Sequence, residues 1–550
     1  MARMRRGSHF VLACLCCVVL RGAFATVDLE ALKSDIAATW RCHKDTNPGL
    51  AVSVVKDGKV VFAEGFGQAD KENNVPVTNQ TQFGIASLSK AFAATLLLKL
   101  ISRRSDITLS TKVVDILGDE FAFPDEFRTK YTTLEDILSH RTGLRPFNNI
   151  RFDTNLTRAN LIGRIKYLGS TGEWRGSYIY NNLMYGVVTR IAEVLGGDTW
   201  ENLVQKELYD PLQMTSSSFA TTLDFSQNQV AKPYFIKDGA PTPLNVDFSR
   251  RWALLCGSGC VVTTAVDAAN WMRFHLSKGL DPSGRRVMEE TDIDELYAAR
   301  TAMKSYTLKY FNKPETPFTS VFGMYAFGFR VGYYRGYKMI AHSGSTWGYR
   351  ALLTLLPTEK LGIFIAMTGD DPNYKYRFPL QNYIADHILG EEPWLNVSTI
   401  CSFPAPWYNE TSSSASYKMD KSLSHDHKKY EGIYYHKGFG NLEVYYNDTQ
   451  QQLIAKYGFA TWKLYEQDGN NFYGKGFGIM EPKTCNSMTF KMAKNSQFDE
   501  VEAGCFEPSI PPVFLRGGTA TSGVGVAGHW WSLQSCVVPL SMFLIFMCRE

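Results

Sequence analysis

The stretch FGIASLSKAFAATLLLKLIS, residues 83–102, places Ser87 and Lys90 three positions apart at the start of a long apolar run. In a helix, residues three apart lie on the same face, so the lysine amine can reach the serine hydroxyl. The start of a helix also presents unpaired N–H groups and a partial positive charge, which suit a developing oxyanion. The stretch therefore predicts a serine nucleophile paired with its base. The alternative is a helix cap at Ser87 and a solvated Lys90.

A second S-x-x-K pattern, Ser53 to Lys56, is a test of this interpretation. It lies in GLAVSVVKDGKVVFAEGFG, which predicts a β-hairpin turning at Asp57 and Gly58. In a strand, residues three apart point to opposite faces of the sheet, so Lys56 does not reach Ser53. We therefore place the candidate chemistry at residues 87–90 alone.

Two further segments bring polar groups. SYIYNNLMYG contains Tyr180 and Asn182, and IAHSGSTWGYRALL contains His342 and Gly344 before an apolar strand. Taken separately, these residues also fit a core tyrosine, a helix cap and a structural surface histidine.

Taken in order, the three segments resemble the S-x-x-K, Y-x-N and [KH]-x-G motifs of the serine β-lactamase-related family. The similarity is closest to its class C β-lactamase, D-alanyl-D-alanine carboxypeptidase and secreted esterase branch. VVKDGKVV with GFG, LSHRTGL at 138–144 and GSGCVVTTAVDAANW at 257–271 are also similar, and the resemblance spans roughly residues 27–390. It implies a serine hydrolase that works through an acyl-enzyme.

Acyl transfer gives each polar residue a role. Ser87 attacks a carbonyl carbon, and Lys90, with a pKa depressed by apolar surroundings, removes its proton. Tyr180 acts as a proton relay, and the sequence leaves open whether it does so as phenolate or as phenol. Asn182 has an amide that can orient Lys90 and the amide of a substrate.

The third motif concerns the oxyanion and the substrate. The resemblance places the oxyanion between the backbone N–H groups of Ser87 and Ser345, on an edge strand, and Gly344 leaves room for the substrate. His342 departs from the lysine usual in β-lactamases and peptidoglycan carboxypeptidases. A histidine is mostly neutral at pH 7 and anchors a carboxylate weakly, which favours uncharged esters, amides or peptides over β-lactams as substrates. His140 in LSHRTGL is expected to be structural.

The fold class expected is α/β, with a β-lactamase/transpeptidase-like sheet flanked by helices, an all-helical subdomain, and a small antiparallel β domain after it. The β domain, rich in Tyr and Phe, resembles the lipocalin-like module of some relatives. The expected divisions are a signal peptide at 1–25, a catalytic domain at 26–395, a linker at 396–424, a small β-barrel-like domain at 425–515 and an anchor-like tail at 516–550.

The two ends of the chain favour an extracellular location. The basic MARMRRGSH, the apolar FVLACLCCVVL and AFA predict a secretory signal. Small residues followed by the apolar segment from Cys536 to Cys548 favour a GPI signal, with a membrane-spanning helix and free secretion as the alternatives. Membrane contact is expected only through this tail.

The net charge argues against nucleic acid as a partner. Four arginines before residue 26 account for the formal net charge of +4, so the remaining chain is neutral and has no basic run. The partner expected is a small ester, amide or peptide, and no cofactor is expected. The sequence specifies no oligomeric state.

Six cysteines lie between the signal and the tail, an even number that suggests disulfides. We expect Cys256 to pair with Cys260 and Cys485 with Cys505. No metal site is expected, because no CxxC or HExxH pattern occurs between the signal and the tail. Five sequons predict candidate glycosylation sites at Asn79, Asn155, Asn396, Asn409 and Asn447.

Two functions remain as hypotheses. The first is a secreted or cell-surface serine hydrolase; the second is a catalytically idle binding or matrix scaffold on the same fold. A scaffold has no physical need to keep Ser87, Lys90, Tyr180 and His342 together, which favours the hydrolase. An α/β-hydrolase is rejected because no G-x-S-x-G elbow occurs, and a dinucleotide fold because GFGQAD lacks the third glycine.

Overall fold

The computed structural model describes residues 28–170, 172–227, 229–303, 319–407, 416–492 and 497–517. The expected signal peptide, nearly all of the expected tail and the sequon at Asn409 lie outside these ranges. Within them, no helix is long and apolar enough to cross a membrane.

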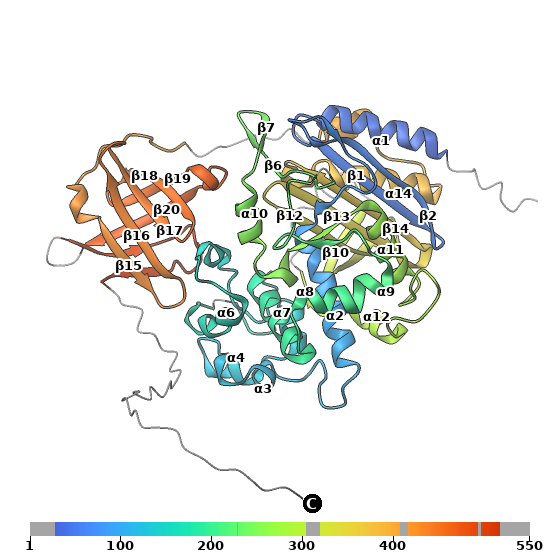
Figure 1. The fold of residues 1–550 in the computed structure, drawn as a ribbon, viewed down its shortest axis with the longest axis horizontal. Helices are drawn as coiled ribbons and strands as arrows, with labels where there is room; N and C mark the ends of the chain where they lie inside the picture. Colours follow the sequence, from blue (N-terminus) through green and yellow to red (C-terminus); the bar gives the residue numbers. More distant parts are fainter. Residues whose placement is uncertain are drawn as a thin grey trace, which may run out of the picture. The chain divides into compact units, whose positions relative to one another are not determined.

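A nine-stranded antiparallel sheet is the centre of the larger module (Figure 1). The hairpin near the N-terminus pairs with a strand more than 300 residues later, as in Val52 opposite Ile365. Asp57 and Gly58 both have positive φ, 51° and 76°, as the predicted two-residue turn requires. In sheet order the strands are β3 (Val75–Pro76), β2 (Lys59–Asp70), β1 (Gly49–Lys56), β14 (Leu361–Thr368), β13 (Tyr349–Leu356), β12 (Tyr337–Thr346), β11 (Arg330–Tyr334), β10 (Ser320–Tyr325) and β9 (Thr301–Ala302).

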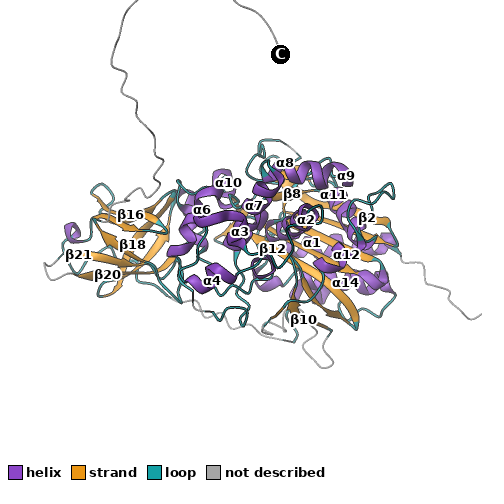
Figure 2. Ribbon diagram, turned by 90° about the horizontal axis from the view of Figure 1, so that it is seen from below, coloured by secondary structure: helices purple, strands orange, loops and turns teal. Residues whose placement is uncertain are grey.

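Both faces of this sheet are covered, and its central strands are accordingly buried along their length: β14 at every position and β1 at every position except Lys56 (Figures 1 and 2). Alternate residues point to opposite faces. Val52 and Ile365 pack in one core with α1 (Leu29–His43) and α14 (Arg377–Leu389). Ala51 and Phe364 face the other core, which includes α11 (Ala265–Leu276). The expected sheet built from distant parts of the chain is confirmed.

Helices form the second part of the module, and two of them carry the candidate site. α2 (Ser89–Ile101) is buried at every position, and a 3-10 turn over Ala86–Leu88 precedes it. Ser87 therefore lies in this turn rather than in the helix. α7 (Asn182–Gly196) packs beside α2, is capped by Asn181, and ends at Gly197 with φ 69°.

The C-terminal module is a closed antiparallel barrel of eight strands. Aromatic side chains fill its interior, among them Tyr430, Phe472, Phe490 and Phe498, with ring centroids 4.4 to 5.9 Å apart. The barrel strands are β15 (Gly432–His436), β16 (Gly440–Asn447), β17 (Gln452–Tyr457), β18 (Ala460–Asp468), β19 (Asn471–Gly476), β20 (Cys485–Met492), β21 (Phe498–Glu502) and β22 (Val513–Arg516).

The segment between the modules is more ordered than an exposed linker. It begins with α15 (Val397–Ser402), which Asn396 caps and which packs on α1. A disulfide between Cys42 and Cys401 joins these two helices. The first residues of the expected linker are therefore fixed to the sheet module.

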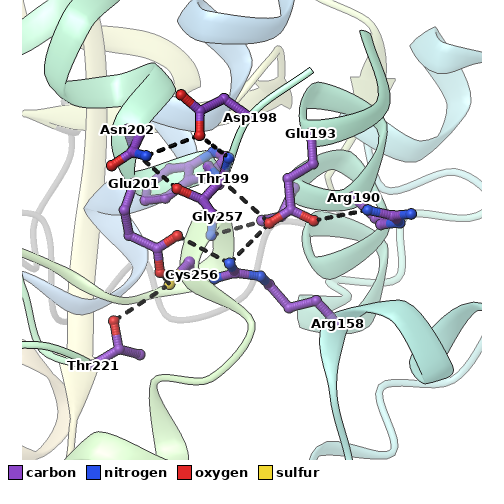
Figure 3. A network of polar contacts seen from close by, with 12 residues as sticks. Arg158, Arg190, Glu193, Asp198, Thr199, Glu201, Asn202, Thr221, Cys256 and Gly257 are labelled. Atoms are coloured by element: carbon purple, nitrogen blue, oxygen red, sulfur yellow. Dashed lines mark hydrogen bonds and ion pairs between the residues drawn. The ribbon is translucent and has the colours of Figure 1, made fainter. Parts of the chain in front are cut away.

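The disulfide predictions have opposite outcomes. The Cys485–Cys505 bond is present in the barrel. The prediction of a Cys256–Cys260 bond is wrong: both thiols are buried and free. The Cys256 thiol instead donates to Glu201 Oε1 at 3.2 Å and lies 3.8 Å from the Thr221 hydroxyl (Figure 3). The Cys256 thiol therefore belongs to a hydrogen-bond network with Glu201 and Thr221 and not to a disulfide.

Candidate active site

Lys90 is the centre of the site and is fully buried. Its Nζ lies 3.1 Å from Ser87 Oγ, 2.8 Å from Asn182 Oδ1 and 2.8 Å from the Ser258 carbonyl oxygen. Burial, with the positive charges of Arg151 and Arg330, lowers the pKa of Lys90 well below its ordinary value.

These three contacts suit a neutral amine. A neutral amine has two N–H donors, which Asn182 Oδ1 and the Ser258 carbonyl accept. Its lone pair then faces Ser87 Oγ, the group whose proton it must take. The lysine is thus fixed in the geometry of a general base.

Tyr180 closes the other side of Lys90, whose Nζ lies 4.7 Å from the centre of the phenol ring. The Tyr180 hydroxyl oxygen is buried and makes no hydrogen bond of regular geometry among the described residues, although the Ser87 side chain is close enough to interact with it. Burial raises the pKa of Tyr180, so the resting side chain is a phenol rather than a phenolate. A buried hydroxyl without a regular hydrogen bond is available to a reacting atom.

The His140 ring packs against the Tyr180 ring. The two ring centroids are 4.5 Å apart, and His140 Nδ1 accepts a hydrogen bond from the Asn181 N–H at 3.1 Å. His140 is fully buried with φ 60°, and burial lowers its pKa well below the ordinary value. Its contacts are those of a residue that positions its neighbours.

His342 is buried in β12, not at the surface. Nδ1 lies 2.8 Å from the Ser343 carbonyl and donates to it, so Nε2 accepts from the Tyr325 hydroxyl at 3.2 Å. Burial, then the charges of Arg330 and Lys90, lower the pKa of His342 well below its ordinary value. The ring is neutral, as the sequence argument assumed.

Arg330, which sequence reasoning missed, supplies the cation that His342 does not. It lies at the start of β11 opposite Ala341, and its Nη1 donates to Ser343 Oγ at 3.3 Å. Its Nε is buried without a partner, and Arg330 forms no ion pair within the described ranges. Although burial opposes the charge, nearby tyrosines raise the pKa of Arg330. The sequence feature that could have revealed Arg330 is a single charged residue within the otherwise uncharged strand segment AFGFRVGYY.

Gly344 lets β12 lie directly against the serine turn. A Cβ on Gly344 would stand 2.1 Å from the Ile85 carbonyl oxygen, a backbone atom. Ala86, the next residue, has φ 48°, a strained conformation outside glycine. Close approach of two backbones brings Ser345 and Ser87 to the same region.

The strand offers the substrate an open side. β12 is internal to the sheet order, not an edge strand, but β11 pairs only with residues 337–341 of it. Residues 342–346 pair with β13 alone. Arg377, buried and ion-paired to Asp371 at 3.0 Å, donates to the Gly344 carbonyl and to Ser345 Oγ at 2.8 Å, which fixes this half of the strand.

A second missed group lies behind Asn182. Asn182 Nδ2 donates to Asn148 Oδ1 at 2.8 Å, and the same oxygen accepts from Arg151 Nη2 at 3.0 Å. Arg151 stacks 3.6 Å from the Trp252 ring. Burial lowers the pKa of Arg151 to about 9. The chain of contacts from Arg151 to Asn182 orients the amide that holds Lys90.

The turn that carries Ser258 is fastened by the network of Figure 3. Arg158 makes two hydrogen bonds to Glu201, at 2.8 and 2.9 Å, and an ion pair with Glu193 of α7 at 2.8 Å. Glu201 in turn accepts from the Cys256 thiol. The network thus ties the turn at 256–258 to α7, the helix that begins with Asn182.

The sequence-predicted residues Ser87, Lys90, Tyr180 and Asn182 meet at one point, with His342, Gly344 and Ser345 on the adjoining strand. Within the described ranges no group of three or more His, Cys, Asp or Glu side chains is placed to hold a metal ion. The sequons at Asn79, Asn155 and Asn396 are exposed, Asn447 is partly exposed, and glycosylation of all five stays a prediction.

Known proteins with similar sequences include hydrolases. Gigasin-6 of Magallana gigas is 36% identical over 252 residues, which cover 45% of this chain and 83% of that protein. Unguisins hydrolase ungD of Aspergillus violaceofuscus is 26% identical over 504 residues, covering 86% of each.

Solved structures share the fold. The octameric penicillin-binding protein homologue from Pyrococcus abyssi has a TM-score of 0.56 at 19% identity, over 88% of this chain and all of that one. A class C β-lactamase from Rhodobacter sphaeroides has a TM-score of 0.51 at 19% identity, over 66% of this chain and 99% of that one. A model of the beta-lactamase family matches residues 36–385. The chain therefore belongs to the beta-lactamase family and is an enzyme of the serine hydrolase type.

Proposed function

We propose that the chain is a secreted or cell-surface serine hydrolase that cleaves an ester, amide or peptide bond through an acyl-enzyme on Ser87. One observation carries the proposal. The buried amine of Lys90 is held by Asn182 Oδ1 and the Ser258 carbonyl oxygen with its third contact on Ser87 Oγ at 3.1 Å, so the neutral form can take the serine proton. The signal-like N-terminus and the sequons support the location.

Acylation follows from this geometry. Lys90 takes the proton of Ser87 as Oγ attacks the carbonyl carbon, which gives a tetrahedral intermediate. The backbone N–H groups of Ser87 and Ser345 stabilise its oxyanion. The intermediate collapses, the bond to the leaving group breaks, and the Tyr180 phenol passes a proton to that group. Lys90 restores the proton of Tyr180.

Deacylation repeats the steps with water as nucleophile. Water loses a proton through the Tyr180 and Lys90 pair and attacks the acyl carbon, and Ser87 leaves with a proton returned to Oγ. Asn182 keeps Lys90 in place throughout, and Asn148 keeps Asn182 in place. Every group in the cycle returns to its starting state.

The charges around the site extend the proposal to the substrate. Arg330 and Arg151 form no ion pair within the described residues, and both lie close enough to Lys90 to lower its pKa. The expectation of uncharged substrates from the sequence depended only on the neutral imidazole of His342. With Arg330 beside His342, the site favours a substrate that bears negative charge near the cleaved bond.

A covalent probe tests the proposal. A fluorophosphonate is applied to the purified full chain and to Ser87→Ala, and covalent adducts are measured by intact mass. Labelling of the wild type that is lost in Ser87→Ala supports an activated serine. No labelling of the folded wild type overturns the hydrolase proposal and favours the scaffold.

A further inference from the structure

Two loops of the barrel hold the 3-10 turn Asn148–Phe152 near its two ends. The N–H of Phe459, between β17 and β18, donates to the Phe152 carbonyl oxygen at 3.1 Å. Asn149 Nδ2 donates at 2.9 Å to the carbonyl oxygen of Cys505, which lies between β21 and β22. The part of this turn that reaches the active site therefore lies between two contacts with the barrel.

An ion pair from Glu507 to Arg145 is a third contact with the barrel. Glu507 Oε1 accepts from Arg145 Nε at 3.1 Å and from Nη2 at 3.0 Å. The Glu507 side chain is only 4% exposed, so water does not replace a lost partner there and the pair is costly to break. Arg145 Nη2 also donates to Ser509 Oγ at 2.7 Å. The Arg145 side chain is thus fixed to the barrel.

The backbone of Arg145 holds the start of α7. Its carbonyl oxygen accepts from Nδ2 of the fully buried Asn181 at 3.0 Å. Asn181 Oδ1 in turn caps α7 by accepting from a backbone N–H of that helix at 3.0 Å. The helix begins at Asn182, whose Oδ1 accepts from Lys90 Nζ at 2.8 Å. A series of hydrogen bonds and short stretches of chain therefore connects Glu507 with Lys90.

The contact with Cys505 reaches Asn182 from its other side. Asn148, the residue before Asn149, accepts from Asn182 Nδ2 at 2.8 Å. Cys505 is bonded to Cys485 of β20, so the carbonyl that holds Asn149 belongs to a cross-linked part of the barrel. Two routes from the barrel thus meet at Asn182.

Catalysis depends on the exact place of Asn182, because its amide holds Lys90 against Ser87. A displacement of about 1 Å in such a centre lowers a rate about 100-fold. We propose that the barrel positions this catalytic centre, with Glu507 as a positioning residue that acts through Arg145. The inference rests on the proposed serine chemistry and adds the barrel to what that chemistry requires.

Substitutions at the two contacts test the proposal on the full chain. Glu507→Leu removes the oxygens that accept from Arg145, whereas Glu507→Gln keeps an acceptor. Asn149→Leu breaks only the separate hydrogen bond to Cys505. Glu443→Leu is the matched control, because it changes a barrel glutamate that is 49% exposed.

The rate of Ser87 labelling by an uncharged fluorophosphonate is measured over a range of pH, and denaturant unfolding shows which variants are folded. Glu507→Leu and Asn149→Leu should each react about tenfold more slowly than the wild type. A loosened centre admits water to Lys90 and relieves the burial that lowers its pKa, so the pH midpoint of labelling should rise in both. Glu507→Gln should recover most of the rate, and Glu443→Leu should match the wild type.

A wild-type rate and midpoint in folded Glu507→Leu overturn the proposal, even where the variant is less stable, because Glu507 then supports the fold alone. An equal loss of rate in Glu443→Leu also overturns it, since the effect is then not specific to these contacts. Asn149→Leu, which loses a single hydrogen bond, decides the question by the same criteria if Glu507→Leu does not fold. Failure to label Ser87 in the wild type instead overturns the proposed hydrolase.

Discussion

Lys90 Nζ lies 3.1 Å from Ser87 Oγ although Ser87 belongs to a 3-10 turn and Lys90 to α2. The strained φ of Ala86 and the turn rotate Ser87 out of the helix without breaking the contact. Ser87 thus stays in contact with its base while the turn that carries it packs against β12.

The rate of Ser87 labelling should depend on the protonation of Lys90. Only the neutral amine acts as a base, so the rate rises with pH through the pKa of Lys90, which burial, Arg151 and Arg330 lower. Arg330→Met removes one of these charges and should move the midpoint to higher pH. The measurement is the pH profile of labelling by an uncharged fluorophosphonate.

Arg285→Met is the control for this shift, because that guanidinium is exposed on the surface. Its midpoint should equal that of the wild type. An unchanged midpoint in Arg330→Met would show that Arg330 does not act on Lys90.

Gly344→Ala should slow the labelling of Ser87 strongly. The new Cβ would stand 2.1 Å from the Ile85 carbonyl oxygen, so β12 must move away from the serine turn. A displacement of about 1 Å is enough to lower the rate about 100-fold. Labelling rates of Gly344→Ala and Gly323→Ala provide the comparison, since a Cβ on Gly323 meets nothing within 4 Å. Equal rates in the two variants would contradict the close approach.

Local spacing explains which site residues the sequence could reveal. Ser87 and Lys90 are three residues apart in sequence, and Asn182 starts a helix whose cap, Asn181, is visible in the sequence. Arg330 reaches the site through the pairing of β11 with β12, and Arg151 through a 3-10 turn held by the barrel. Such contacts depend on tertiary structure, which one sequence does not specify.

The cysteines show the same limit. Cys485 and Cys505 are 20 residues apart in one small module, and their pairing was predictable. Cys42 and Cys401 are 359 residues apart and meet only because α1 and α15 pack together. Cys256 and Cys260 are close in sequence, yet the Cys256 thiol is held by Glu201. Proximity in sequence alone was misleading there.

Alkylation of the unfolded, unreduced protein should therefore modify Cys256 and Cys260 and leave the four disulfide-bonded residues Cys42, Cys401, Cys485 and Cys505 unmodified. Peptide mapping by mass spectrometry identifies the modified residues. After reduction, all the mapped cysteines should react, which controls for access of the reagent. Protection of Cys256 and Cys260 before reduction would mean that these two are bonded.

Asn148→Leu should weaken both the fold and the catalysis. The substitution keeps the size of the side chain but removes the oxygen that accepts from Asn182 Nδ2 and Arg151 Nη2. Two buried donors without an acceptor should lower the free energy of unfolding by about 1–3 kcal/mol. Because the Asn182 amide then no longer holds Lys90 in place, the labelling rate should fall about tenfold.

Asn148→Asp restores the acceptor and should recover most of the stability, but its negative charge should move the pH midpoint of labelling upward. Asn155→Ala, an exposed position in the same region, should behave as the wild type. Denaturant unfolding and labelling rates of the three variants distinguish the outcomes: a loss of stability in Asn148→Leu with no loss of labelling would mean that Asn148 supports the fold alone.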